Sequence, residues 1–274
     1  MANFNRINFV EESVASYLEF MGEKELIVVD CLSTDGSLEF LSSYADVIIS
    51  EKDSSVYEAW NKALTRATGH WIFFLNTDDC LLPDFNEIYA QLPIYQEFDM
   101  LRFEIEIQDQ NNLAEVSLKS PMYSYSEIIS SPIYFNGYIF AASVFKIVGT
   151  FNENFRYCAD QDFLWRCKEQ GLTSKILKNV GYRYTRHLNS LTISNSTLFF
   201  EEEKLIAELR LFFAKNRRSK KMAEKWVEWE TLSTKHLENK FLRIFSRLLN
   251  TKTYLIQLFQ IFVKIESPVA RLFN

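Results

Sequence analysis

Two apolar runs that each stop abruptly at carboxylates constrain this chain more than any other feature. Residues 26–29 are Leu, Ile, Val and Val and lead into Asp30, while residues 71–75 lead into Asn76, Thr77, Asp78 and Asp79. Such runs are typical of strands buried on both faces of a parallel sheet. Because ligands of open α/β sheets bind beyond the carboxyl ends of the strands, we expect both acidic groups to line one site. A cation between them would relieve their repulsion, and solvated turns are the alternative.

Helical and strand patterns alternate along the first part of the chain. We predict helices over 8–21, 37–43 and 56–67, and strands over 25–30, 46–49 and 71–75. This alternation predicts βαβ units and an α/β fold with a mostly parallel sheet flanked by helices. Residues 99–108 alternate between apolar and charged side chains, which predicts a half-buried strand nearer an edge of the sheet. From residue 197 onward the pattern is helical, so we predict one domain over 1–195 and a helical extension over 196–274.

The totals exclude several classes of protein. The net charge of -6 argues against a general nucleic-acid binder, and the apolar fraction of 47% is that of an ordinary globular chain. The four cysteines form no CxxC pair and no metal-type spacing, so we expect reduced thiols in a cytosolic protein. No signal sequence is recognisable, and the longest late apolar stretch, 254–263, is far shorter than the ~20 residues that span a bilayer.

Several short motifs follow one another in a recognisable order. They are Val28-Val29-Asp30, Ser33-Thr34-Asp35-Gly36, Asp53, Tyr57-Glu58-Ala59-Trp60-Asn61-Lys62, Ala67-Thr68-Gly69, Asn76-Thr77-Asp78-Asp79, Val148-Gly149-Thr150-Phe151-Asn152-Glu153 and Ala159-Asp160-Gln161-Asp162-Phe163. In this order and spacing the chain resembles a family 2 glycosyltransferase of the GT-A fold, from residue 3 to about 190. The resemblance implies hexosyl transfer from a nucleotide-sugar donor, with inversion at the anomeric carbon.

The resemblance also implies a divalent cofactor, Mn²⁺ or Mg²⁺. Asn76-Thr77-Asp78-Asp79 occupies the place of the family's metal-binding acidic motif, with Asn76 where an aspartate is often found. Asp78 and Asp79 are therefore expected to hold the ion, which would neutralise charge on the diphosphate leaving group. The alternative for this pair is a helix cap. His187 corresponds to a late histidine that some members use as a further metal ligand; otherwise it is an ordinary surface or core residue.

Asp160 lies where the family places its general base, the carboxylate that takes the proton from the acceptor hydroxyl. Asp162 follows two residues later, and on a helix the two side chains would point to different sides. We expect Asp160 to be the base. Arg166 is one turn beyond Asp162 and is expected to pair with it. Arg183 and Arg186 are open to two readings, as contacts to the diphosphate or as cations facing solvent.

For the donor, the family uses the end of the first strand, the acids after the second, and an acid before the Tyr-x-Ala-x-Asn helix. These positions are Asn3 with Phe4, Asp30 with Asp35, and Asp53, and Asn61 lies in that helix. We expect these residues to bind substrate, with a UDP-sugar as the favoured donor. Cys31 and Leu32 depart from the family pattern, so the donor base stays open. Neither GxGxxG nor GxxxxGK[ST] is present.

The start of the chain also departs from the family, which opens with a buried strand of about five residues. Only Met1 precedes the turn-like residues 2–6, so this strand is expected to be missing beside strand 25–30. Its absence would leave unpaired backbone groups and an exposed apolar face. Either the start codon has been assigned too far downstream, or the chain is a damaged enzyme.

Residues 240–265 combine many apolar side chains with basic ones. Such a helix can lie on an anionic membrane surface, and packing against the catalytic domain or a second subunit is the alternative. The leading hypothesis is an enzyme of polysaccharide biosynthesis that acts on a glycan or lipid-linked acceptor, in the cytoplasm and peripherally at the inner face of the membrane. The alternatives are a nucleotidyltransferase, whose Gly-rich loop is lacking, and a non-catalytic remnant that binds membrane or a partner.

Overall fold

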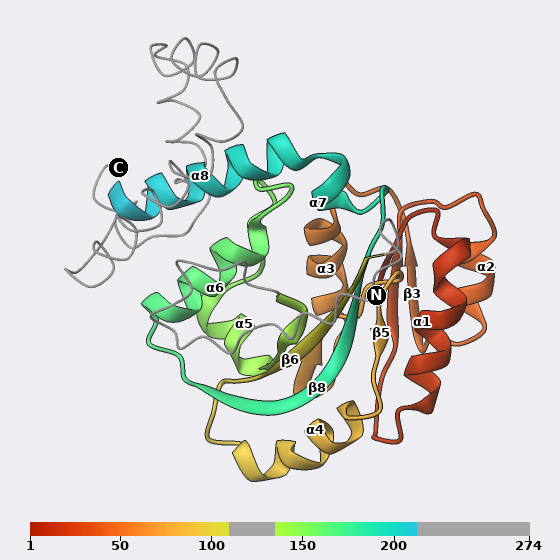
Figure 1. Cartoon of the computed structure of the whole chain (residues 1–274), viewed down its shortest axis with the longest axis horizontal. Coiled ribbons are helices and arrows are strands. Elements are labelled where there is room, and N and C mark those ends of the chain that lie inside the picture. Colours follow the sequence, from red (N-terminus) through yellow and green to blue (C-terminus); the bar gives the residue numbers. More distant parts are fainter. Residues whose placement is uncertain (110–134, 213–274) are drawn as a thin grey trace.

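The computed structural model describes residues 1–109 and 135–212, and Figure 1 shows the arrangement of their elements. The strands are β1 (Ala2–Asn3), β2 (Ile27–Asp30), β3 (Val47–Ser50), β4 (Trp71–Phe73), β5 (Cys80–Leu81), β6 (Met100–Asp109), β7 (Tyr138–Ala141) and β8 (Ser174–Arg186). The α-helices are α1 (Ile7–Glu19), α2 (Ser37–Ser42), α3 (Val56–Leu64), α4 (Phe85–Gln91), α5 (Ala142–Val148), α6 (Ala159–Glu169), α7 (Leu191–Ser194) and α8 (Ser196–Phe212). Short 3₁₀ helices are η1 (Leu92–Tyr95) and η2 (Phe135–Gly137). The helices and strands predicted before residue 75 are all present, with ends shifted by a few residues.

The described strands form two sheets. The first has the order β1-β2-β3 and is parallel throughout. The second has the order β4-β7-β6-β8-β5, in which β6 and β8 pair in parallel and the other neighbours pair antiparallel. The predicted parallel βαβ pattern therefore describes the first sheet, whereas the second is mixed.

Strand β6 lies at the centre of the second sheet, so the prediction that residues 99–108 lie nearer an edge was wrong. Its alternation is real: Leu101 and Ile105 are fully buried. The charged side chains of this strand are half-buried, and Arg102 and Glu106 lie against partners within the sheet. Glu106 accepts from Nε of Arg183 at 3.0 Å, and the Arg102 guanidinium lies 5.1 Å from the centroid of a tyrosine ring in the same sheet. Alternation can thus arise in a central strand when the polar face finds ion pairs and rings.

The first strand is present in short form, which corrects the expectation that it is missing. In β1, Ala2 and Asn3 pair in parallel with Val29 and Asp30 of β2. The amino group of Met1 donates to the carbonyl oxygen of Ile27 at 2.7 Å, and the Met1 carbonyl accepts from the Val29 amide at 2.9 Å. Backbone groups on this side of β2 are therefore paired, and Asn3 is carried to the edge where Asp30 lies.

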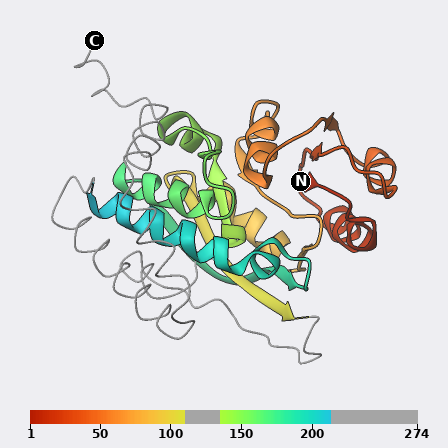
Figure 2. The same ribbon diagram turned by 90° about the horizontal axis from the view of Figure 1, so that it is seen from above.

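Apolar packing joins the two sheets to their helices. One buried cluster brings Val10 and Val14 of α1 against Val28 of β2. A second cluster lies around Phe140 and Phe163 and includes Ile206 and Ala207 of α8. Residues of α8 thus pack within this core, and the predicted domain boundary at residue 195 stays a prediction. Figures 1 and 2 both show α8 running beside α6.

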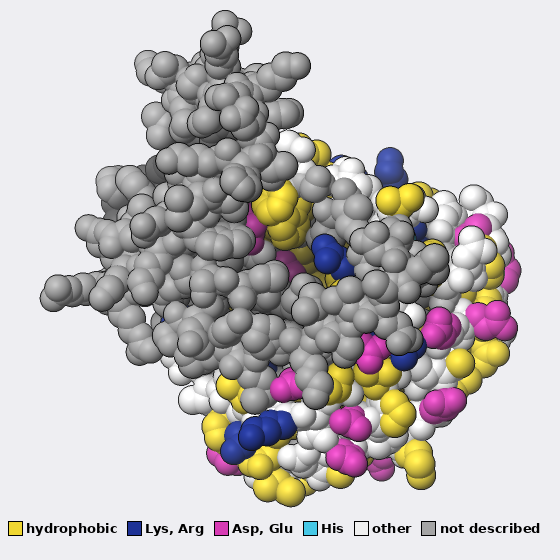
Figure 3. Space-filling view, viewed as in Figure 1, with side chains coloured by type: hydrophobic (Ala, Val, Ile, Leu, Met, Phe, Trp, Pro, Cys, Tyr) yellow, Lys and Arg dark blue, Asp and Glu magenta, His cyan; other side chains and the backbone are white. Residues whose placement is uncertain are grey.

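The visible surface of the protein mixes side chains of several kinds. Figure 3 shows acidic side chains scattered among apolar ones on the visible face, without a large basic patch among the coloured residues. Over residues 1–109 and 135–212 no helix has the length and apolar character needed to cross a membrane. The segment 240–265, which the sequence suggests as a membrane-docking helix, lies outside the described residues.

Candidate active site

The carboxyl ends of β1 and β2 carry a tight polar network. The Asn3 side-chain amide donates to Oδ1 of Asp30 at 2.6 Å and to Oγ of Ser37 at 2.9 Å. Asp35 accepts from the backbone amides of Ile7 and Ser37 at 2.9 and 3.0 Å. Asp30 is fully buried, and Oδ1 of Asn3 has no partner among the described residues. Three of the predicted donor-binding residues, Asn3, Asp30 and Asp35, are therefore held together in one network.

Left-handed backbone occurs at the same edge. Asn5 and Leu32 have φ values of 51° and 53°, and they are the non-glycine residues with positive φ among those described. This conformation is unusual for a residue as bulky as leucine. Leu32 is 55% exposed and Phe4 is 58% exposed, so two apolar side chains face solvent at the edge where the buried Asp30 lies. Asp53 lies across from them, with its backbone amide donating to Sγ of Cys31 at 3.3 Å.

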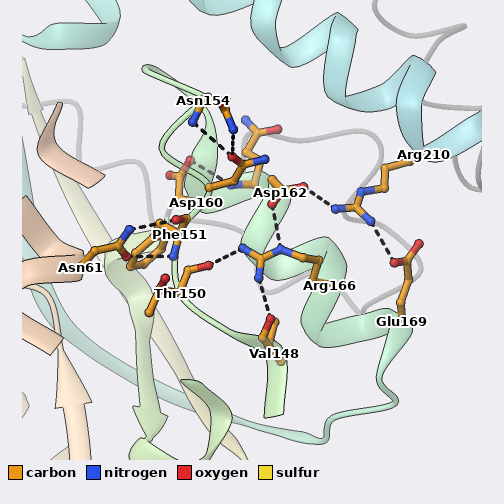
Figure 4. Close-up of polar contacts among 12 residues, drawn as sticks. Asn61, Val148, Thr150, Phe151, Asn154, Asp160, Asp162, Arg166, Glu169 and Arg210 are labelled. Atoms are coloured by element: carbon orange, nitrogen blue, oxygen red, sulfur yellow. Dashed lines mark hydrogen bonds and ion pairs between the residues drawn. The ribbon is translucent and has the colours of Figure 1, made fainter. Parts of the chain in front are cut away.

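Asn61 is occupied within the protein. Its side-chain amide donates to the Phe151 carbonyl at 2.9 Å and to the Glu153 carboxylate at 2.8 Å, and its oxygen accepts from the Phe151 amide at 2.9 Å. The residue is 9% exposed. In Figure 4 it reaches from α3 to the loop that precedes α6. Asn61 thus links α3 to the loop before α6. Its predicted contact with substrate stays a prediction.

Asp78 and His187 approach each other although they lie 109 residues apart in the sequence. Nε2 of His187 lies 3.0 Å from Oδ2 of Asp78, and their side chains are 7% and 18% exposed. The imidazole is held by stacking on Phe9, with ring centroids 4.5 Å apart, and Nδ1 has no partner among the described residues. A buried imidazole beside a partly exposed carboxylate suits a divalent cation that completes its shell with substrate oxygens and water. No group of three such ligands occurs within the described residues.

Asp79 is placed differently from its neighbour. It is fully buried, and its two oxygens accept from Oη of Tyr182 at 2.6 Å, Nδ2 of Asn76 at 2.9 Å, Nδ2 of Asn136 at 3.1 Å and the Thr185 amide at 2.7 Å. Burial, with the neighbouring charge of Asp78, raises the pKa of Asp79 to about 8. Because every contact goes to a donor within the protein, this carboxylate fastens the Asn76–Asp79 turn to β8. The metal contact of Asp79 that the resemblance implies stays a prediction.

Asp160 lies in the first turn of α6 and is only partly buried. Its Oδ1 accepts from Oη of Tyr57 at 3.0 Å and from the Gln161 amide at 2.9 Å. Burial raises the pKa of Asp160 to about 6, against the opposing effect of the Tyr57 hydroxyl. A carboxylate with a pKa near the working pH suits a general base.

Asp162 faces the other side of the same helix, as Figure 4 shows. It is 3% exposed and pairs with Nε of Arg166 at 2.8 Å and with Arg210 of α8. Burial raises the pKa of Asp162, but Arg210 and Arg166 outweigh it and hold that pKa below its usual range. The predicted Arg166–Asp162 pair is confirmed. With both oxygens bound by guanidinium groups, Asp162 has no free face for a substrate proton.

Sequence reasoning missed several residues that complete the site. Tyr57 stands within one of the motifs, and Tyr182 precedes Arg183, so a search for hydroxyl donors near each carboxylate could have found them. No local sequence pattern marks Asn136 or Glu202, because their partners are distant in the sequence. Asn136 binds the carboxylate of Asp79 and Glu202 binds the backbone amide of Cys158, each more than forty residues away. Arg183, one of the cations left open, pairs with Glu106 and more loosely with Glu12.

Comparison with known proteins agrees with the site. Residues 1–102 match the model of "Glycosyl transferase family 2". The PGL/p-HBAD biosynthesis glycosyltransferase of Mycobacterium bovis is 26% identical over 154 residues, which are 53% of this chain and 59% of that protein. The putative teichuronic acid biosynthesis glycosyltransferase TuaG of Bacillus subtilis is 28% identical over 142 residues, or 48% of this chain and 56% of TuaG. The chain thus spans less than two thirds of either relative.

Solved structures share the fold. S. aureus TarS 1-349 in complex with UDP-GlcNAc gives a TM-score of 0.61 at 18% identity, covering 83% of this chain and 69% of TarS. The mannosyltransferase PcManGT of Pyrobaculum calidifontis, in complex with GDP-Man and Mn²⁺, gives 0.60 at 14% identity, covering 99% and 85%. The motifs and the family model over residues 1–102 make the chain similar to glycosyltransferase family 2, and the solved structures show that it has the GT-A fold.

Proposed function

We propose that this protein transfers a sugar from a nucleotide-sugar donor to a glycan or lipid-linked acceptor, with inversion, during synthesis of a cell-surface polysaccharide. The observation that carries the proposal is Asp160, a partly exposed carboxylate whose pKa is raised to about 6 while its neighbour Asp162 is locked in ion pairs. The names of the relatives support the substrate class, since they refer to teichuronic acid and to PGL/p-HBAD biosynthesis.

In the proposed reaction Asp160 takes the proton of the acceptor hydroxyl as that oxygen attacks the anomeric carbon. The new glycosidic bond forms as the bond from that carbon to the diphosphate oxygen breaks, and the nucleoside diphosphate leaves from the opposite face. Tyr57 holds the carboxylate in the orientation seen here. The polar network of Asn3, Asp30 and Asp35 at the ends of β1 and β2 would receive the nucleoside.

Asp78 and His187 would hold a divalent ion, Mn²⁺ or Mg²⁺, which supplies positive charge to the leaving diphosphate. The buried imidazole with one unpartnered nitrogen, set against the partly exposed carboxylate, fits this role. A UDP-sugar is the favoured donor in the proposal. A lipid-linked acceptor would bring the enzyme to the inner face of the cytoplasmic membrane.

A thermal-shift screen tests the donor site directly. The protein is heated with UDP, GDP, dTDP or CMP, each with and without Mn²⁺. We expect one nucleotide to raise the Tm, and only in the presence of the metal, because the diphosphate and the ion bind together. Release of nucleoside diphosphate from the matching sugar donor then measures transfer. No stabilisation by any of the four would count against the proposed function.

The pH dependence of turnover follows from the raised pKa of Asp160. A general base works only when deprotonated, so kcat/KM should fall as the pH drops through about 6, rather than through the usual aspartate range near 4. Replacing Tyr57 by phenylalanine removes a hydrogen bond that favours the charged carboxylate, so this acid limb should move to higher pH.

The control for this prediction is Tyr44→Phe, which removes the hydroxyl of a tyrosine that is 39% exposed in the turn after α2. Its pH profile should match that of the unmodified protein. A Tyr57→Phe profile that is unchanged, or that moves to lower pH, would show that the titrating group is not Asp160.

A further inference from the structure

Helix α6 begins without a cap of its own. Its N-cap residue, Cys158, makes no side-chain capping hydrogen bond. A carboxylate from a distant helix holds the turn that leads into α6: Glu202 of α8 accepts from the backbone amides of Arg156, Tyr157 and Cys158 at 2.7, 2.6 and 2.7 Å. Of these amides, that of Cys158 belongs to the N-cap residue, and a negative charge beside a helix N-terminus interacts favourably with the helix dipole. Charge-assisted bonds of this length are among the stronger ones in proteins.

Two further contacts fasten α8 to α6 beyond the capped turn. Glu203 accepts from the Gln161 side-chain amide at 2.9 Å, with both residues buried. Arg210 pairs with Glu169 at 2.9 Å and with Asp162, and Figure 4 shows it reaching from α8 to both carboxylates. The contacts made by α8 therefore fall on both sides of Asp160 along the chain.

Different helices hold the Asp160 side chain and the backbone of the 156–158 turn. Oη of Tyr57, on α3, lies 3.0 Å from the Asp160 carboxylate and 2.9 Å from the Tyr157 carbonyl. Glu202 holds the amides of the turn that ends at Cys158, two residues before Asp160. A base must lie within hydrogen-bond reach of the proton it takes, and a displacement of about 1 Å can lower the rate by roughly a hundredfold.

We propose that Glu202 is a positioning residue for Asp160: its carboxylate caps the 156–158 turn and so sets where the base meets the acceptor hydroxyl. This inference rests on the proposed function, because it assigns to Asp160 the role of base. It makes α8 part of the machinery of transfer although no residue of that helix is assigned a contact with substrate. Without the anion, three amides lose their acceptor and the turn is free to shift.

The test compares Glu202→Gln with Glu201→Gln. Both remove one negative charge from neighbouring positions of α8, and the Glu201 carboxylate makes no hydrogen bond or ion pair with the described residues. In Glu202→Gln we expect kcat to fall roughly tenfold to a hundredfold. The KM for the donor and the metal-dependent stabilisation by nucleotide should stay unchanged. Glu201→Gln should match the unmodified protein in all three.

Amide hydrogen exchange of residues 156–158 supplies a readout that does not need turnover. Exchange should become faster in Glu202→Gln and stay unchanged in Glu201→Gln. Should Glu202→Gln fail to fold, Glu202→Asp replaces it, since it keeps the anion with a shorter reach, and the same split between kcat and KM is expected at smaller amplitude.

Two results would overturn the inference. One is an unchanged kcat in a variant whose 156–158 amides exchange faster, because the cap would then serve stability alone. The other is unchanged exchange, which would show that Glu202 does not hold the turn. If the unmodified protein transfers no sugar from any donor, the proposed function fails instead, and the exchange comparison still decides whether Glu202 fixes the turn.

Discussion

Asp160→Asn should abolish most of the transfer while leaving the protein folded and able to bind its donor. Loss of a general base lowers the rate by a factor on the order of 10²–10⁴, so we expect kcat to fall at least a hundredfold. The asparagine oxygen can still accept from Oη of Tyr57, which now lies 3.0 Å from the aspartate, so the turn should keep its shape. Nucleotide binding measured by thermal shift should not change.

The natural contrast is Asp162→Asn, the same chemical change two residues later. Asp162 is buried between Arg166 and Arg210, and removing its charge leaves both guanidinium groups short of a partner. The loss should appear in stability, at roughly 3 kcal/mol in the free energy of unfolding. Near-normal turnover in Asp160→Asn together with lost turnover in a folded Asp162→Asn would transfer the role of base to the second carboxylate.

Asp79→Asn and Asp78→Asn should affect different properties, the first stability and the second metal binding. Asp79→Asn puts an NH₂ group in place of one carboxylate oxygen. In one orientation this NH₂ faces the donors of Tyr182, Asn76 and Asn136, and in the other it faces the Thr185 N–H. With buried donors left unpaired, we expect the free energy of unfolding to fall by about 3 kcal/mol. Chemical denaturation in the absence of metal and nucleotide measures this directly.

Asp78→Asn should give the opposite result. Its side chain is 18% exposed, and within residues 1–109 and 135–212 its polar contact is with His187, so stability should change little. The stabilisation by nucleotide with Mn²⁺ should disappear, and Mn²⁺ binding measured by electron paramagnetic resonance should weaken. If Asp79→Asn kept full stability and lost Mn²⁺ binding, the metal would belong to Asp79 as the sequence had suggested.

The sequence predicted those parts of the fold that depend on local pattern. The apolar runs before Asp30 and before Asn76 located β2 and β4, but only β2 is buried throughout as such a run predicts. β4 is half-buried at the edge of the second sheet and pairs antiparallel with β7, so the expectation of a parallel strand was wrong there. The place of β6 could not be read in this way. Its polar face is neutralised by partners such as Arg183, which lies 77 residues away and has no local signature.

The same distinction runs through the candidate site. Residue types at motif spacing singled out Asp78 and Asp79 together, but only the fold shows that Tyr182 and Asn136 take up one carboxylate and leave the other accessible. The resemblance to the family pointed to Asp160 as the base, and the helical spacing indicated only that Asp160 and Asp162 face different sides. Glu202 could not be foreseen, since its partners are backbone amides, which have the same chemistry in any sequence.

The layout of the sheets also sets an order of assembly. β1, β2 and β3 are complete by Ser50, so this sheet can pair as soon as the first fifty residues are made. β6 must wait for β8, because Met100 pairs with Ser174 and Asp109 with Arg186. Pairing across such a separation is slow, and it leaves an apolar strand unprotected meanwhile. In pulsed hydrogen exchange during refolding, amides of β2 should therefore become protected before those of β6, and chaperones would meet this chain with its central strand still unpaired.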